Sequence, residues 1–229
     1  MPPDPATLDW WSDGETTVAG LVARLSDDDL AAPSALPGWS RAHVVAHLAR
    51  NADALGNLLT WARTGVETPM YPSRAVRDAD IEATAAQPAA DLRKDFAAAC
   101  ARLAEAVETL PAQAWTAQVR TGQGQPVPAS HVPWMRAKEV WVHGTDLRAG
   151  LSFADLPPGF CAALVDEVLA HFAAHDQPVQ ATVVATDVDR TWGFGAPTVR
   201  GPVGAVAAWL TRSDASGLEG DVPPPPTWL

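Results

Sequence analysis

The sequence predicts an α+β protein in which a four-helix bundle precedes a small mixed domain. In its N-terminal two-thirds, apolar residues recur every three or four positions, which is typical of amphipathic helices. Near residue 152 this pattern gives way to short β-branched runs bounded by Gly and Pro. With 47% hydrophobic and 19% charged residues, the chain has the composition of a globular protein. We therefore expect a helical bundle over residues 1–151 and a small α+β domain over residues 152–229.

The first two helices of the bundle are predicted from their apolar spacing. The first covers residues 6–25, and the second begins after the N-cap Ser40 and ends near Arg63. The second has the clearest buried stripe, which consists of Val44, Leu48, Ala52, Leu55 and Leu59. The polar, proline-containing residues 64–87 are expected to form a connection without a helix.

Two further helices complete the predicted bundle. The third covers residues 88–110 and starts with a proline in its first turn. After a loop at 111–129, Ser130 is expected to cap a fourth helix over residues 131–147, with Gly150 as its terminator. Four helices with two long connections favour an antiparallel bundle.

The second domain is predicted to mix helices and strands. A Leu-Pro-Pro-Gly segment opens a helix that ends near Ala174. The Val-rich residues 179–186 are expected to form a strand that pairs with residues 191–194. A further short strand and a helix ending at Leu210 follow, and the proline-rich residues 221–229 should be extended.

Charge and cysteine content exclude several classes of function. Sixteen Lys and Arg against 27 Asp and Glu give a net charge of -11, which repels nucleic acid and anionic membrane surfaces. The two cysteines, Cys100 and Cys161, are too few for a disulfide framework and are typical of a reducing compartment. No basic leader or run of about 20 apolar residues is visible. We expect a cytoplasmic protein, either monomeric or a small homo-oligomer.

The candidate metal ligands lie on two of the predicted helices. Glu139 and His143 are four residues apart, so they share one face of the fourth helix. A catalytic zinc needs about three N or O ligands, and the third must come from another helix. Helical geometry places His47 nearer the buried stripe than His43. The same spacing also occurs in ordinary hydrogen-bonded bundle residues, so at this point both interpretations stand.

Three neighbouring polar residues are candidates to support such a site. Asn51 lies on the same side of its helix as His47, where a polar residue is easier to explain beside a metal. Asp146 is expected to accept a proton from His143, and Arg136 to orient Glu139 or a substrate carboxylate. Alternatively, Asp146 and Arg136 are ordinary charges at the rim of the bundle.

The motifs LPGWSRAHVVAHLARNADA, at residues 36–54, and EVWVHGTDL, at residues 139–147, resemble the mycothiol-dependent maleylpyruvate isomerases. That family belongs to the metal-binding DinB-like superfamily. The resemblance implies a DinB-like bundle and a divalent metal, usually zinc, bound by His47, Glu139 and His143. It also implies that the C-terminal segment WLTR contributes Arg212 as a catalytic residue that binds a substrate carboxylate.

The resemblance implies a reaction that uses zinc and mycothiol. Mycothiol thiolate adds to the cis double bond of maleylpyruvate, the resulting single bond rotates, and the thiolate leaves to give fumarylpyruvate. The partners are then a small-molecule thiol and a maleylpyruvate-like substrate. Two other classes stay open: a mycothiol S-transferase that joins the thiol to another electrophile, and a metal-binding protein without enzymatic activity.

Overall fold

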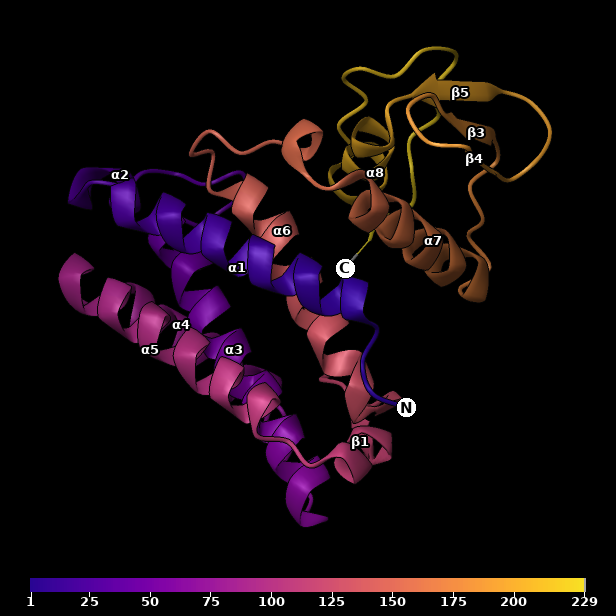
Figure 1. Cartoon of the computed structure of the whole chain (residues 1–229). Coiled ribbons are helices and arrows are strands. Elements are labelled where there is room, and N and C mark those ends of the chain that lie inside the picture. The colour runs from indigo at the N-terminus through magenta and orange to yellow at the C-terminus, as the bar shows by residue number, and fades with distance from the viewer. Residues whose placement is uncertain (229) are drawn as a thin grey trace. The chain divides into compact units, whose positions relative to one another are not determined.

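The computed structural model describes residues 1–228, and the chain divides into two compact units. The first unit ends at Gly150 and the second begins at Leu151. The first unit consists of helices and one short strand pair, and the second combines helices with a small sheet (Figure 1). This is the predicted α+β fold class, with the helical part first. In the described residues, no helix is both long and apolar enough to cross a membrane.

Six α-helices form the first unit. They are α1 (Pro5–Arg24), α2 (Asp27–Ala31), α3 (Arg41–Thr64), α4 (Arg74–Ala85), α5 (Ala89–Glu108) and α6 (Val132–Asp146). The loop between α5 and α6 holds the 3-10 turns η1 (Ala112–Thr116) and η2 (Ala129–His131) and the antiparallel pair β1 (Gln118–Arg120) and β2 (Pro126–Pro128). The four predicted long helices correspond to α1, α3, α5 and α6, so these predictions are confirmed.

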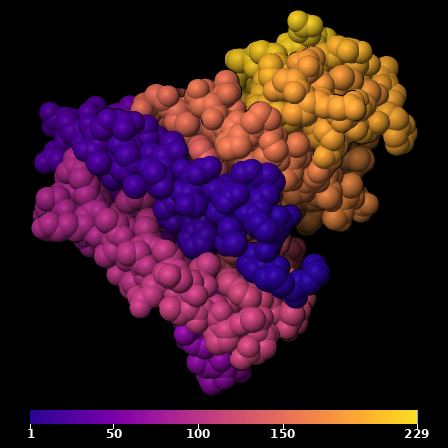
Figure 2. Space-filling view, viewed as in Figure 1, coloured from indigo at the N-terminus to yellow at the C-terminus, as the bar shows by residue number. Residues whose placement is uncertain are grey.

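Helix α3 is the centre of the first unit, because it packs against α4, α5 and α6. All five residues of its predicted stripe are fully buried. Burial of each large apolar side chain contributes about 1.5–3 kcal/mol. The side chains of α1 and α5 cover most of the visible face of this unit (Figure 2). Ser40 caps α3 by accepting from the His43 N–H, and Gly65 ends it with a φ of 72°.

Helices α1 and α6 approach each other closely at Gly14. A Cβ at this position would lie 2.7 Å from Val140 Cγ2 and 2.9 Å from Trp141 Nε1. The Trp141 indole also donates to the Trp10 carbonyl oxygen at 2.7 Å. Gly14 therefore lies inside α1 because a larger residue would separate the two helices.

Three sequence predictions for the first unit were wrong in detail. Helix α4 lies within the segment expected to be a connection, and Ser73 caps it. Only two of the twelve α4 residues are buried. Ser130 belongs to η2 and does not cap α6, which starts after His131. Helix α6 ends at Asp146, before the predicted terminator Gly150. The short helix α2 was not predicted either.

The second unit is a three-stranded sheet with two helices. Its elements are η3 (Phe153–Asp155), α7 (Pro158–Ala174), β3 (Thr182–Ala185), β4 (Arg190–Trp192), β5 (Thr198–Gly201) and α8 (Val203–Arg212). The strand order is β4-β3-β5, with β3 antiparallel to β4 and parallel to β5. Val183 pairs with Val199, and both are buried. Residues 221–228 have no regular structure, and Leu229 of the predicted tail lies outside the described residues.

Candidate metal centre

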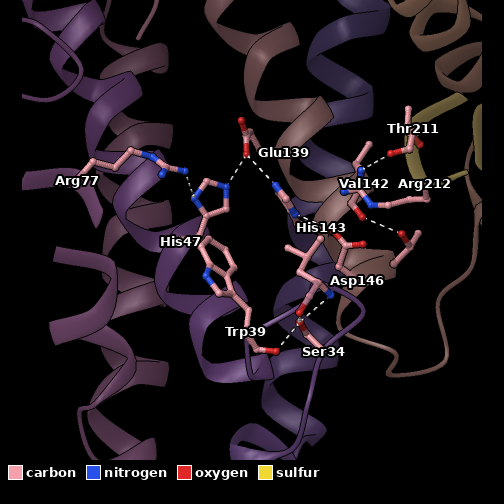
Figure 3. Close-up of polar contacts among 12 residues, drawn as sticks. Ser34, Trp39, His47, Arg77, Glu139, Val142, His143, Asp146, Thr211 and Arg212 are labelled. Atoms are coloured by element: carbon pink, nitrogen blue, oxygen red, sulfur yellow. Dashed lines mark hydrogen bonds and ion pairs between the residues drawn. The ribbon is translucent and has the colours of Figure 1, made fainter. Parts of the chain in front are cut away.

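Three potential metal ligands meet between α3 and α6. His47 Nε2 lies 2.8 Å from Glu139 Oε2, and His143 Nε2 lies 3.4 Å from the same oxygen. One donor atom from each residue lies within 4.8 Å of the others. The three side chains converge on one point (Figure 3). The structure therefore brings together the three residues that the sequence analysis nominated.

Local structure explains how the three side chains reach this point. Glu139 and His143 are one turn apart on α6, and His47 lies on the face of α3 that packs against α6. The turn before α3 is closed by the Trp39 N–H to the Leu36 carbonyl oxygen at 3.1 Å, with Gly38 at a φ of 79°. This turn places the Trp39 ring 5.7 Å from the His47 ring, between centroids.

Asp146 fixes the orientation of His143. Its Oδ2 lies 2.8 Å from His143 Nδ1, which confirms the predicted contact. A carboxylate only accepts hydrogen bonds, so Nδ1 carries the proton and Nε2 offers a lone pair toward Glu139. With 1% of its surface exposed, Asp146 has little freedom to leave this position.

Electrostatics favour the forms of these residues that bind metal. Burial lowers the pKa of His47, which favours the neutral imidazole. Burial alone would raise the pKa of Glu139, but the hydrogen bond from His47 and the electrostatic interaction with both imidazoles outweigh it and lower that pKa overall. Two imidazole nitrogens and one carboxylate oxygen are a donor set that suits zinc and leaves a coordination position for another ligand. The residues present therefore fit a catalytic zinc ion.

Arg77 and Tyr71 also lie at this site, and the sequence analysis missed both. Arg77 Nη2 lies 3.4 Å from His47 Nδ1, and the guanidinium carbon lies 5.7 Å from the centroid of the Tyr71 ring. Burial, together with the charge of Glu139, raises the pKa of Tyr71 to about 12. Both residues belong to the segment that was expected to have no helix. The N-cap Ser73 was the available signal for a helix that would carry Arg77.

Arg136 has a different role from the one expected. It is completely buried, and its hydrogen bonds go to Glu15 at 2.6 Å, the Leu48 carbonyl oxygen at 2.7 Å and Asn51 at 2.9 Å. The expectation that Arg136 orients Glu139 or a substrate carboxylate was therefore wrong. A buried guanidinium needs partners for its N–H groups, and this need explains why Asn51 faces the interior.

The remaining candidates are His43, Arg212 and the two cysteines. His43 Nδ1 lies 2.7 Å from the Ser40 hydroxyl and its Nε2 3.2 Å from Glu82, so it serves as part of the cap of α3. Arg212 is the last residue of α8, in the second unit, where its Nη1 donates to the Thr211 carbonyl oxygen at 2.8 Å. Burial raises the pKa of both Cys100 and Cys161 to about 12. Both thiols are therefore protonated near neutral pH.

The fold and site define a class of protein: a helical bundle with two histidines and one carboxylate grouped so that they could hold a metal ion, followed by a small α+β unit. The family model of the mycothiol maleylpyruvate isomerase N-terminal domain matches residues 11–148. This match covers more than half of the chain, so the chain belongs to that family.

Comparison with solved structures extends the likeness to both units. A crystal structure of the mycothiol-dependent maleylpyruvate isomerase has a TM-score of 0.91 and 30% identity, and the match covers 97% of this chain and 96% of that one. A mutant of that enzyme gives the same values. Two uncharacterized proteins of Mycobacterium tuberculosis, from strains CDC 1551 / Oshkosh and H37Rv, are 30% identical over 138 residues. That match covers 57% of this chain and 51% of each relative, so the chain spans about half the length of these curated relatives.

Proposed function

We propose that this protein is a zinc- and mycothiol-dependent maleylpyruvate isomerase, which converts maleylpyruvate to fumarylpyruvate. The observation that carries the proposal is the convergence of His47, Glu139 and His143 in a chain that matches such an isomerase over 97% of its length. The likeness of the fold supports the reaction class, and the donor set supports the metal.

The side chains have distinct roles in the proposed site. His47, Glu139 and His143 would hold the zinc ion. When bound, zinc supplies a position at which a thiol loses its proton well below its free pKa of about 8.5. Asp146 keeps the proton on His143 Nδ1, so that Nε2 stays available. Glu139 stays ionised because its pKa is lowered.

The nucleophile in this proposal comes from a small molecule. Both cysteines are protonated near neutral pH, because burial raises the pKa of each thiol to about 12. The sulfur of mycothiol forms a bond to one alkene carbon of maleylpyruvate, and the electron pair of the double bond moves toward the adjacent carbonyl. The former double bond is then single and can rotate. Return of the electron pair from the carbonyl oxygen re-forms the double bond in the trans geometry and expels the same thiolate, so mycothiol is regenerated.

Two arginines are assigned to the anionic substrate. Arg77 supports this assignment because its guanidinium contacts His47 while 26% of its side-chain surface stays exposed. A guanidinium matches a planar carboxylate with two parallel hydrogen bonds. Arg212 is assigned to a substrate carboxylate on the basis of the WLTR motif.

A turnover assay tests the proposal directly. The zinc-loaded protein is given maleylpyruvate with and without mycothiol, while product and free thiol are both measured. We expect fumarylpyruvate only when mycothiol is present, with no net consumption of thiol. Consumption of mycothiol in proportion to product would instead identify an S-transferase. Zinc binding without any turnover or thiol consumption would favour a metal-binding protein without this activity.

A further inference from the structure

A second pair of metal-ligating side chains lies at the end of α7. His171 belongs to the last turn of this helix and His175 follows the helix directly. Four positions separate them, so they are neighbours on one face. Their ring centroids lie 4.3 Å apart, and the ring planes are tilted by 37°. The pair belongs to the second unit, whereas His47, Glu139 and His143 belong to the first.

One of these rings has a fixed tautomer. His175 Nδ1 lies 2.8 Å from the carbonyl oxygen of His171. Because a carbonyl oxygen only accepts hydrogen bonds, Nδ1 carries the proton, and the lone pair of the neutral ring is on Nε2. Metal-binding histidines commonly donate their other ring N–H to a carbonyl or carboxylate in this way. His175 is therefore already arranged to offer Nε2 as a ligand.

The surroundings of the pair suit a cation that arrives from solvent. His171 is half-buried and His175 is exposed, so a hydrated ion can reach both rings. The C-terminal end of a helix carries partial negative charge from its unpaired carbonyl groups. Glu167 adds a carboxylate one turn before His171 on the same face.

We propose that His171 and His175 form a second site for a divalent transition metal, with water completing the coordination. Imidazole nitrogens favour zinc, copper and nickel over magnesium and calcium. Two protein ligands hold an ion less tightly than three, so this site is the weaker of the two. Its existence does not depend on the proposed isomerase activity.

Calorimetric titration of zinc into untagged, metal-free protein tests the second site. The wild-type chain should bind two ions, one tightly and one weakly. His171→Ala and His175→Ala should each weaken the second event by about a hundredfold, because removal of one ligand ends bivalent attachment. His47→Ala should lose only the tight event. His131→Ala is the matched control, since it removes a histidine outside both groups, and it should bind like the wild type.

Two results would overturn the second site. One is a weak event that persists unchanged in both His171→Ala and His175→Ala, and the other is the loss of both binding events in His47→Ala. If circular dichroism shows that a variant has lost its fold, copper is titrated into the wild-type protein instead. Paramagnetic broadening must then affect the ring protons of His171 and His175 before those of His131. If the wild-type protein lacks only the tight binding event, the result contradicts the proposed function and does not contradict the site at His171 and His175.

Discussion

His143 and Asp146 form a hydrogen bond of 2.8 Å across one turn of α6, between the Nδ1 and Oδ2 atoms. The bond joins a ring at the candidate metal centre to a carboxylate that is almost completely buried. It determines both the tautomer of the ring and the direction in which Nε2 points. Asp146 should therefore influence metal affinity without contacting the metal.

Replacement of Asp146 tests this influence. Asp146→Ala should lower zinc affinity about 10- to 100-fold, the usual effect of removing a partner of a metal-binding histidine. Asp146→Asn should have a smaller effect, because its amide oxygen can still accept the bond. Competition with a chromophoric chelator measures the affinity. The exposed Asp9→Asn on α1 is the control, and equal affinities for all three variants would contradict the assignment.

The three nominated ligands can be separated from His43 by metal analysis. His47→Ala, Glu139→Ala and His143→Ala should each lose most of the tightly bound zinc and essentially all activity. His43→Ala should keep its zinc, since Ser40 and Glu82 are the partners of its ring. Loss of the cap contact should lower its free energy of unfolding by about 1 kcal/mol. Normal zinc in His47→Ala, or zinc loss in His43→Ala, would reverse the assignment.

The cysteines provide a test of where the nucleophile comes from. A thiol with a pKa of about 12 is only about one part in ten thousand thiolate at pH 8, and the thiolate fraction rises tenfold per pH unit up to that pKa. We therefore expect both cysteines to react slowly with iodoacetamide, and faster as pH increases. A Cys100→Ala, Cys161→Ala double variant should keep its activity with added mycothiol. A folded but inactive double variant would show that the nucleophile is internal.

Arg77 should act on the substrate and leave the metal in place. Its guanidinium is the cation that contacts His47, so Arg77→Gln should raise KM for maleylpyruvate about tenfold, equivalent to about 1.4 kcal/mol. Zinc content should not change, because a guanidinium only donates hydrogen bonds and, unlike Asp146, cannot accept one from the Nδ1–H of a metal-binding histidine. Arg74→Gln is a matched control on the same helix, because the Arg74 side chain is 93% exposed. Equal KM values for the two variants would remove Arg77 from the proposed substrate site.

Local signals explain what the sequence predicted well. The spacing of Glu139 and His143 and the N-cap Ser40 act within one or two turns of a helix, so sequence alone reveals them. The angular position of His47 followed from the apolar stripe of the same helix. These signals account for the agreement on the long helices and on the convergence of the three candidate ligands.

Non-local contacts explain what the sequence did not reveal. Arg136 and Glu15 are 121 positions apart, and the sequence of neither segment predicts their pairing. Arg77 reaches His47 only because α4 packs against α3, and a contact between two helices is not visible in the sequence of either one. Residues that depend on tertiary packing were therefore missed or given the wrong role.

Arg212 remains a predicted catalytic residue, and conservative replacement is the sharpest test of it. It ends α8, where the carbonyl groups of the last turn favour a cation. An ammonium keeps the charge of a guanidinium but cannot form two parallel hydrogen bonds with a carboxylate. Arg212→Lys should therefore lower kcat/KM by one to two orders of magnitude, or about 1.4 to 2.7 kcal/mol, while zinc content stays unchanged.

The control for Arg212 must separate loss of substrate binding from loss of stability. Arg200→Lys changes an exposed arginine in β5 of the same unit and should leave the kinetics unchanged. Thermal unfolding of both variants should match the wild type, because Lys keeps the charge at each position. If Arg212→Lys and Arg212→Ala both retain wild-type kinetics, Arg212 is an ordinary surface residue. The substrate carboxylate must then be bound by Arg77 or another cation.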